Sequence, residues 1–319
     1  MSFSQGDPAA AAVVDIAGPL VLGYLFDWSL FGVLSVQVYI YYLAFKNDAR
    51  GYKILVATVY LIETLQTILV AHDLFNIFAT GFGNTESLAQ IHLTWLTVCI
   101  ICTVIASIVQ ILYAYRISLL SRSKVLPLLI CFMAVIQLIG GLIAGIDGHR
   151  MGSLLKRSNL EMAGHLVGTL GSAVCDIVIA VCMVYHLSRA KSHSISFKPT
   201  QALLTRTIRI IIETGTLTAT LAVIDVALFY SKSKTGYFLT PGYTLGKVYS
   251  NSMMVLFNSR INMSGRMSEV IAEPVEFAVP STILNTNTES RASMTEESSI
   301  GLGMPGIKQV DGTKVSKIQ

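Results

Sequence analysis

Charged side chains are scarce in the long apolar segments of this chain, and the few that occur there are the residues best suited to chemistry. An ionisable group in the middle of a bilayer costs about 2.5 to 3.5 kcal/mol on insertion scales, so such groups usually face a helix bundle and find partners. The site candidates among them are Asp27, Glu63, His72, Asp73, Asp176, Asp225 and Lys247, and Glu213 is a further ionisable residue toward the inner half of its segment. We expect Lys247 to form an ion pair with Asp225 or Asp27.

The position of these residues along their segments leaves two interpretations open. With the orientation derived below, Glu63 lies toward the inner half of the membrane and Asp176 near the middle of its helix. The other five form an outer polar cluster: Asp27, His72, Asp73, Asp225 and Lys247. Such a cluster can line a ligand pocket or a water-filled vestibule, or it can consist of buried pairs that fix the register of the helices.

A second polar group lies along the last apolar segment, residues 243–263. It consists of Tyr249, Asn251, Ser252, Asn258 and Arg260. Amide and hydroxyl groups can form hydrogen bonds between membrane helices, each contributing about 0.6 to 2 kcal/mol. This polar band is therefore expected to hold helices together, in preference to acting as a signalling switch.

Familiar enzyme motifs are missing. The sequence contains no HExxH, no HxxxH, no Walker loop and no GxSxG, so the common templates for metal hydrolases, nucleotide enzymes and serine hydrolases do not apply. Cys99 and Cys102 have CxxC spacing, but they lie in an apolar segment without a second ligand pair, which favours packing over metal binding. We expect no metal, no cofactor and no nucleic-acid partner.

The elements that position these residues are predicted to be membrane helices. Hydrophobic residues make up 53% of the 319 residues and charged residues only 13%, whereas soluble domains carry about 25% charged residues. A helix needs about 20 residues to cross a bilayer. Seven segments have this length: Leu20–Phe45, Ile54–Ala79, Leu93–Tyr115, Val125–Ile146, Ala163–Leu187, Thr207–Tyr230 and Tyr243–Met263. The expected fold is all-α, a polytopic membrane protein with a bundle of about seven transmembrane helices, and Pro19 leaves the start of the first segment uncertain.

The basic residues predict the orientation, because Lys and Arg near helix ends are retained on the cytoplasmic side. The loops after the first, third and fifth segments are the richer set, with Lys46, Arg50, Lys53, Arg116, Arg122, Lys124, Arg189, Lys191, Lys198 and Arg206. We therefore expect residues 1–19 outside the cell, residues 20–263 in the plasma membrane, and residues 264–319 as a disordered cytoplasmic tail. The polar composition of that last stretch is typical of disorder.

A resemblance adds to this interpretation. The motifs that carry it are Asp176, the Glu213-Thr214-Gly215 run, Lys247-x-Tyr249-x-Asn251-Ser252 and Asn258-Ser259-Arg260. From about residue 176 to residue 260 the chain resembles a large family of multi-pass membrane proteins from mushroom-forming (basidiomycete) fungi, which is defined by a C-terminal domain of unknown function. The resemblance implies a seven-helix membrane protein and a fungal source, and it brings no ligand, reaction or site residue.

Three functions are compatible with these features. The first is a receptor-like or sensory protein that binds an unidentified ligand and signals to a cytoplasmic partner through the basic loops and the tail. The second is a transporter or channel-like protein in which Glu63, Asp176, Asp225 and Lys247 line a polar path. The third is an integral membrane enzyme that acts on lipid. In each case the lipid bilayer is the surrounding partner.

Overall fold

The computed structural model describes residues 8–81, 90, 92–121, 124–153, 157–193, 198–231 and 235–260. The regular elements in these ranges are helices, as expected, and one isolated bridge pairs Gln90 with Ser153. They are α1 (Pro8–Ala44), α2 (Arg50–Phe75), η1 (Asn76–Thr80), η2 (Trp95–Ile101), α4 (Cys102–Leu120), α5 (Val125–Met151), α6 (Asn159–His193), α7 (Lys198–Ser231) and α8 (Leu239–Asn258), where η1 and η2 are π-helices that continue α2 and precede α4. The predicted tail, 264–319, lies outside the described residues, as do residues 1–7.

Six helical stretches are long and apolar enough to cross a membrane. They are Val13–Ala44, Arg50–Thr80, Trp95–Leu120, Val125–Met151, Asn159–Arg189 and Thr205–Ser231. These stretches coincide with the first six predicted segments and are those of a multi-pass membrane protein. The seventh predicted segment corresponds to α8, which is more polar because it contains Lys247, Asn251 and Asn258, and which is not one of the six.

The first helix starts well before the predicted boundary at Leu20, because α1 continues through Pro19. Proline has no backbone N–H, so the carbonyl four residues earlier loses its usual partner. That carbonyl belongs to Asp15, and the backbone N–H of Gly236 donates a hydrogen bond to it across 3.1 Å. The Thr240 hydroxyl donates to the carbonyl of Pro19 itself at 2.7 Å. Gly236, just before α8, therefore supplies the N–H donor that Pro19 lacks.

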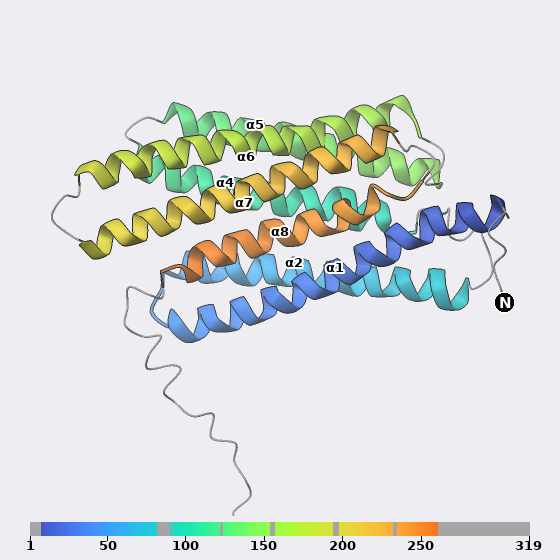
Figure 1. Ribbon diagram of the computed structural model, residues 1–319, viewed down its shortest axis with the longest axis horizontal. Helices are drawn as coiled ribbons and strands as arrows, with labels where there is room; N and C mark the ends of the chain where they lie inside the picture. Colours follow the sequence, from blue (N-terminus) through green and yellow to red (C-terminus); the bar gives the residue numbers. More distant parts are fainter. Residues whose placement is uncertain are drawn as a thin grey trace, which may run out of the picture. The chain divides into compact units, whose positions relative to one another are not determined.

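The most polar helix, α8, is also the most enclosed. It contacts α1, α2, α4 and α7 (Figure 1), and 16 of its 20 residues are buried. A helix that meets protein on most of its sides does not need the apolar surface that lipid requires, so its polar residues can face other helices. Its position explains why hydropathy sets α8 apart from the other helices.

Helices α5 and α6 approach closely along a seam of glycines. A Cβ atom added to Gly140 would lie 2.7 Å from the backbone nitrogen of Gly168, and one added to Gly164 would lie 2.8 Å from the backbone nitrogen of Ala144. Small residues allow helix backbones to come together in this way in membranes. This seam fixes α6, and with it the polar side chains that α6 directs toward α7 and α8.

Candidate functional site

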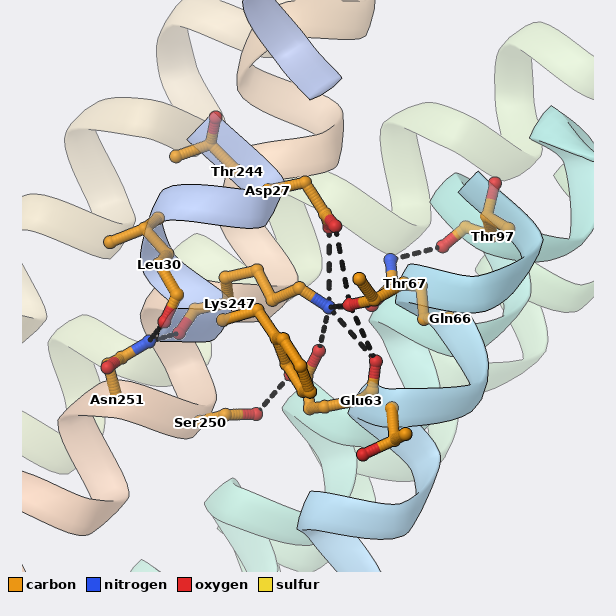
Figure 2. A network of polar contacts seen from close by, with 12 residues as sticks. Asp27, Leu30, Glu63, Gln66, Thr67, Thr97, Thr244, Lys247, Ser250 and Asn251 are labelled. Atoms are coloured by element: carbon orange, nitrogen blue, oxygen red, sulfur yellow. Dashed lines mark hydrogen bonds and ion pairs between the residues drawn. The ribbon is translucent and has the colours of Figure 1, made fainter. Parts of the chain in front are cut away.

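The buried centre of the bundle contains an ion-pair cluster around Lys247. Its ammonium nitrogen lies 2.5 Å from Glu63 Oε2 and 3.3 Å from Asp27 Oδ1, and none of the three side chains is exposed. Asp27 comes from α1, Glu63 from α2 and Lys247 from α8, so the cluster joins three helices (Figure 2). Of the two predicted partners of Lys247, Asp27 is present in the cluster, and Asp225 lies elsewhere.

Neutral groups complete the surroundings of the Lys247 ammonium. It donates to Thr67 Oγ1 at 3.0 Å and to Gln66 Oε1 at 3.2 Å, while the Ser250 hydroxyl donates to the second oxygen of Glu63. Gln66 in turn donates to the carbonyl of Thr97 at 2.9 Å. Figure 2 shows Asp27 from α1 and Glu63 and Thr67 from α2 pointing toward the Lys247 ammonium. Since burial of unpaired charge in a bilayer is expensive, this degree of pairing is what allows a lysine to occupy the position.

A second polar site involves Asp225 on α7. Its Oδ2 atom lies 2.8 Å from Nε2 of His165 on α6, and only 2% of Asp225 is exposed. The His165 ring stacks on Phe229, with ring centroids 3.9 Å apart. The other carboxylate oxygen of Asp225, Oδ1, has no hydrogen-bond partner among the described residues.

Two adjoining cavities meet at His165, and together we call them the α6–α8 chamber. Both are lined by Val98, Cys99, Ala144 and His165, which makes them neighbours. The first is also lined by Asp225, Gly242, Ser172 and Tyr249, and the second by Glu161, Trp95, Phe229 and Phe238. The free volume of each is small, about 40 and 30 Å³. Apolar and aromatic walls with a few polar groups are typical of small-molecule sites.

A third polar group surrounds Asp176 in the middle of α6. The Tyr249 hydroxyl donates to its Oδ2 atom at 2.5 Å, and Gln110 of α4 donates to its Oδ1 atom at 3.0 Å. Gln110 also exchanges hydrogen bonds with Gln137 of α5. A further cavity is lined by Asp176, Tyr249 and Thr218, so Tyr249 lies between this cavity and the α6–α8 chamber.

The other predicted site residues lie apart from these groups. Asp73 is buried and accepts a hydrogen bond from the backbone N–H of Leu93 at 2.9 Å, next to the start of η2. His72 points to the surface, with 60% of its side chain exposed, and its Nδ1 atom is 3.7 Å from Asp73. The five residues predicted as one outer cluster are therefore distributed over three places, and Glu63 joins Lys247 instead.

The polar band of α8 makes most of its contacts with α1. Asn251 donates to the carbonyl of Leu30 at 3.1 Å, and Asn258 donates to the carbonyl of Gln37 at 2.9 Å. Beyond the helix end, Arg260 forms an ion pair with Asp48 at 2.7 Å. These contacts have the helix-holding geometry that the sequence favoured. Ser252 and Tyr249 face the cavity beside Asp176 instead.

Sequence analysis missed His165, Glu161 and Ser172, which occupy one face of α6 together with Asp176. Their spacing was a usable signal, because positions 161, 165, 172 and 176 are separated by four, seven and four residues, which places them on a single side of a helix. Gln110 and Gln137 were also missed, since uncharged amides do not stand out in a search for ionisable groups. Among the described residues no group of three or more His, Cys, Asp or Glu side chains is arranged to hold a metal ion.

Comparison with known proteins adds one finding. Residues 172–262 match the model of a family described as a family of unknown function, DUF6534. No curated protein and no solved structure matches the chain. The matched region contains Asp176, Asp225, Lys247 and Tyr249, so it contributes to each of the three polar groups, while Asp27, Glu63 and His165 come from outside it. The C-terminal domain of unknown function expected over residues 176–260 is therefore present.

Proposed function

We propose that this chain is a receptor-like or sensory membrane protein that binds a small ligand in the α6–α8 chamber. The observation that carries the proposal is the Oδ1 atom of Asp225, a carboxylate oxygen that is buried without a hydrogen-bond partner among the described residues and that borders the chamber. Leaving such an atom unpaired costs about 1 to 3 kcal/mol or more. A ligand that donates a hydrogen bond would remove this cost.

The rest of the chamber favours a ligand with a positive charge. Within the part of the chain that the structure describes, the Oε2 atom of Glu161 also has no hydrogen-bond partner, and the cavity that Glu161 lines has walls of Trp95, Phe229 and Phe238. Carboxylates combined with aromatic faces attract small cations. Arg157 already lies over the Phe229 ring at 3.7 Å, which leaves room for a small ligand only.

The proposed topology places this chamber toward the outside of the plasma membrane. Helix α8 runs beside α1 and meets it at both ends, through Gly236 with Asp15 and through Arg260 with Asp48. These contacts support α8 as a seventh transmembrane helix, and the distribution of basic residues supports an N-terminus outside and a C-terminus in the cytoplasm. The basic loops on the cytoplasmic side and the tail would then contact the signalling partner.

The native thiol of Cys99 provides a test that needs no known ligand, because Cys99 borders both cavities of the chamber. The other four cysteines are replaced by alanine, and intact cells are treated with methanethiosulfonates that carry either a trimethylammonium or a sulfonate group. We expect the cationic reagent to modify Cys99 faster than the anionic reagent. Asp225→Asn should reduce this preference, and Asp48→Asn, which removes the same charge in the connection between α1 and α2, should not. Equal rates for both reagents in the wild type would contradict a cation-attracting chamber.

Small ammonium compounds that protect Cys99 then distinguish a receptor from a transporter. A receptor is stabilised by such a compound, so its Tm rises, and liposomes containing the purified protein do not accumulate the compound. Accumulation in the liposomes would overturn the receptor proposal.

Transport is the second candidate because of Tyr249. This residue borders both the chamber and the cavity beside Asp176, so polar groups continue from the chamber toward the middle of α6. Opening of the contact between Tyr249 and Asp176 would join the two spaces. Tyr249→Phe would then increase accumulation of the compound in liposomes, whereas a receptor would show none with either residue.

A further inference from the structure

The hydrogen bonds around Lys247 do not treat its two carboxylates equally. An ammonium group has three hydrogens to donate, and five oxygen atoms lie within reach of the Lys247 nitrogen. Three are close: Glu63 Oε2 at 2.5 Å, Thr67 Oγ1 at 3.0 Å and Gln66 Oε1 at 3.2 Å. The carbonyl of Glu63 and Oδ1 of Asp27 are both at 3.3 Å. Asp27 Oδ1 accepts no hydrogen bond of good geometry from any residue that the structure describes.

The hydroxyl group of Thr67, which lies beside Asp27, also makes its closest hydrogen bonds with Glu63 and Lys247. A threonine hydroxyl has one hydrogen to donate and two lone pairs that can accept. Thr67 donates to the Glu63 carbonyl at 2.9 Å and accepts from Lys247. The same hydrogen could instead be donated to Asp27 Oδ2, but that oxygen is farther away, at 3.5 Å. The donors near Asp27 are thus at 3.3 and 3.5 Å and have closer acceptors, whereas both oxygens of Glu63 accept short hydrogen bonds.

The charge of the cluster points in the same direction. Two ionised carboxylates and one ammonium would leave a net negative charge at a place where the exposed fraction is zero. The titratable groups that face the cluster from neighbouring positions are Tyr24 on α1 and Cys102 on α4. Both are acids and bring no positive charge. One additional proton makes the cluster neutral.

We propose that this cluster is a proton-binding site in which Asp27 holds the proton, while Glu63 remains ionised as the partner of Lys247. Since Asp27, Glu63 and Lys247 come from three helices, loss of the proton would place two negative charges against one positive charge at the junction of α1, α2 and α8. The inference is independent of any ligand in the α6–α8 chamber.

Infrared spectroscopy of the purified protein in nanodiscs at pH 7 tests the proposal directly. A protonated carboxyl group has a C=O stretching band that is separate from the bands of carboxylates and amides. We expect the wild type to show this band and Asp27→Asn to lose intensity from it. Asp48→Asn is the matched control, because Asp48 is ionised by its pairing with Arg260, and this variant should keep the full band. An unchanged band in Asp27→Asn would overturn the proposal.

Thermal unfolding of the same samples provides a second measurement. Asparagine reproduces the shape and the neutral charge of a protonated aspartate, so Asp27→Asn should keep nearly the wild-type Tm. Glu63→Gln removes the ionised partner of Lys247 and should lower the Tm several times more, and failure of this variant to fold, while Asp27→Asn folds, would count as the same result. If Asp27→Asn lowers the Tm as much as Glu63→Gln, or alone fails to fold, Asp27 is the ionised residue and the proposal is wrong.

Discussion

Individual carboxylates in this protein differ most in what surrounds their oxygen atoms. Both oxygens of Glu63 and of Asp176 accept hydrogen bonds from side chains. Asp225 has one oxygen 2.8 Å from His165 Nε2 and one that has no hydrogen-bond partner among the described residues. A buried group with complete pairing contributes to the structure, whereas an incompletely paired one is available to a ligand. The proposed ligand site depends on this difference, which only the structure reveals.

Outside the membrane-spanning stretches, the pair of Asp48 with Arg260 makes stability depend on pH. Burial raises the pKa of the Asp48 carboxyl, but hydrogen bonds from Arg260 and Tyr41 outweigh burial, so the pKa lies below its ordinary value. A lowered pKa means that the pair contributes fully above the ordinary pKa of about 4 and is lost as the pH falls through the lowered value.

We therefore predict that Asp48→Asn lowers the free energy of unfolding at pH 7 by about 0.2 to 1 kcal/mol, the usual range for an exposed pair. The difference from the wild type should shrink as the pH falls below about 4, because the wild type loses the same pair. Thermal unfolding in nanodiscs over this range measures both effects. Parallel curves for the two proteins at all pH values would show that Asp48 is not linked to stability in this way.

At the scale of the elements, the glycine seam between α5 and α6 determines how closely α6 approaches. We predict that Gly164→Ala destabilises the protein by about 1 to 3 kcal/mol, the usual cost of overpacking, because its Cβ would lie 2.9 Å from the carbonyl oxygen of Gly140. The matched control is Gly32→Ala in α1, where a Cβ meets nothing within 4 Å. Denaturant or thermal unfolding of the two variants compares them. A loss of stability in Gly32→Ala as large as in Gly164→Ala would mean that the seam is not the cause.

The sequence predicts the helices well and their lateral partners poorly. Long apolar segments identify six of the helices, since a helix that crosses the bilayer needs about 20 mostly apolar residues in a row, and such runs can be found in the sequence. The predicted start of α1 was too late. Pro19 leaves the carbonyl of Asp15 without its helical donor, and that carbonyl accepts a hydrogen bond from Gly236, a residue far away in the chain. Likewise, the sequence suggested Asp27 as a partner of Lys247, and the two lie 3.3 Å apart, but the closest partner, Glu63, depends on how α2 faces α8. Such rotations result from packing, which local residue patterns do not specify.

For the molecule as a whole, the central question is whether α8 crosses the membrane. Its 20 residues would extend over about 30 Å at 1.5 Å per residue, close to the thickness of the hydrocarbon core. Its low hydropathy is explained by burial, because α8 contacts α1, α2, α4 and α7 and has little surface for lipid. The location of the residues after α8 therefore provides a decisive measurement.

We predict that α8 crosses the membrane and that residues after it lie on the same side as the connection between α1 and α2. Single cysteines at Asn47, Arg150 and Ser281 are introduced one at a time, in a background without native cysteines, and intact cells are treated with an impermeant maleimide. Arg150→Cys should be labelled at once, while Asn47→Cys and Ser281→Cys should be labelled only after permeabilisation. If α8 does not cross, Ser281→Cys is labelled together with Arg150→Cys. An inverted orientation would label Asn47→Cys and Ser281→Cys instead and would place the α6–α8 chamber toward the cytoplasm, where it could not receive a ligand from outside.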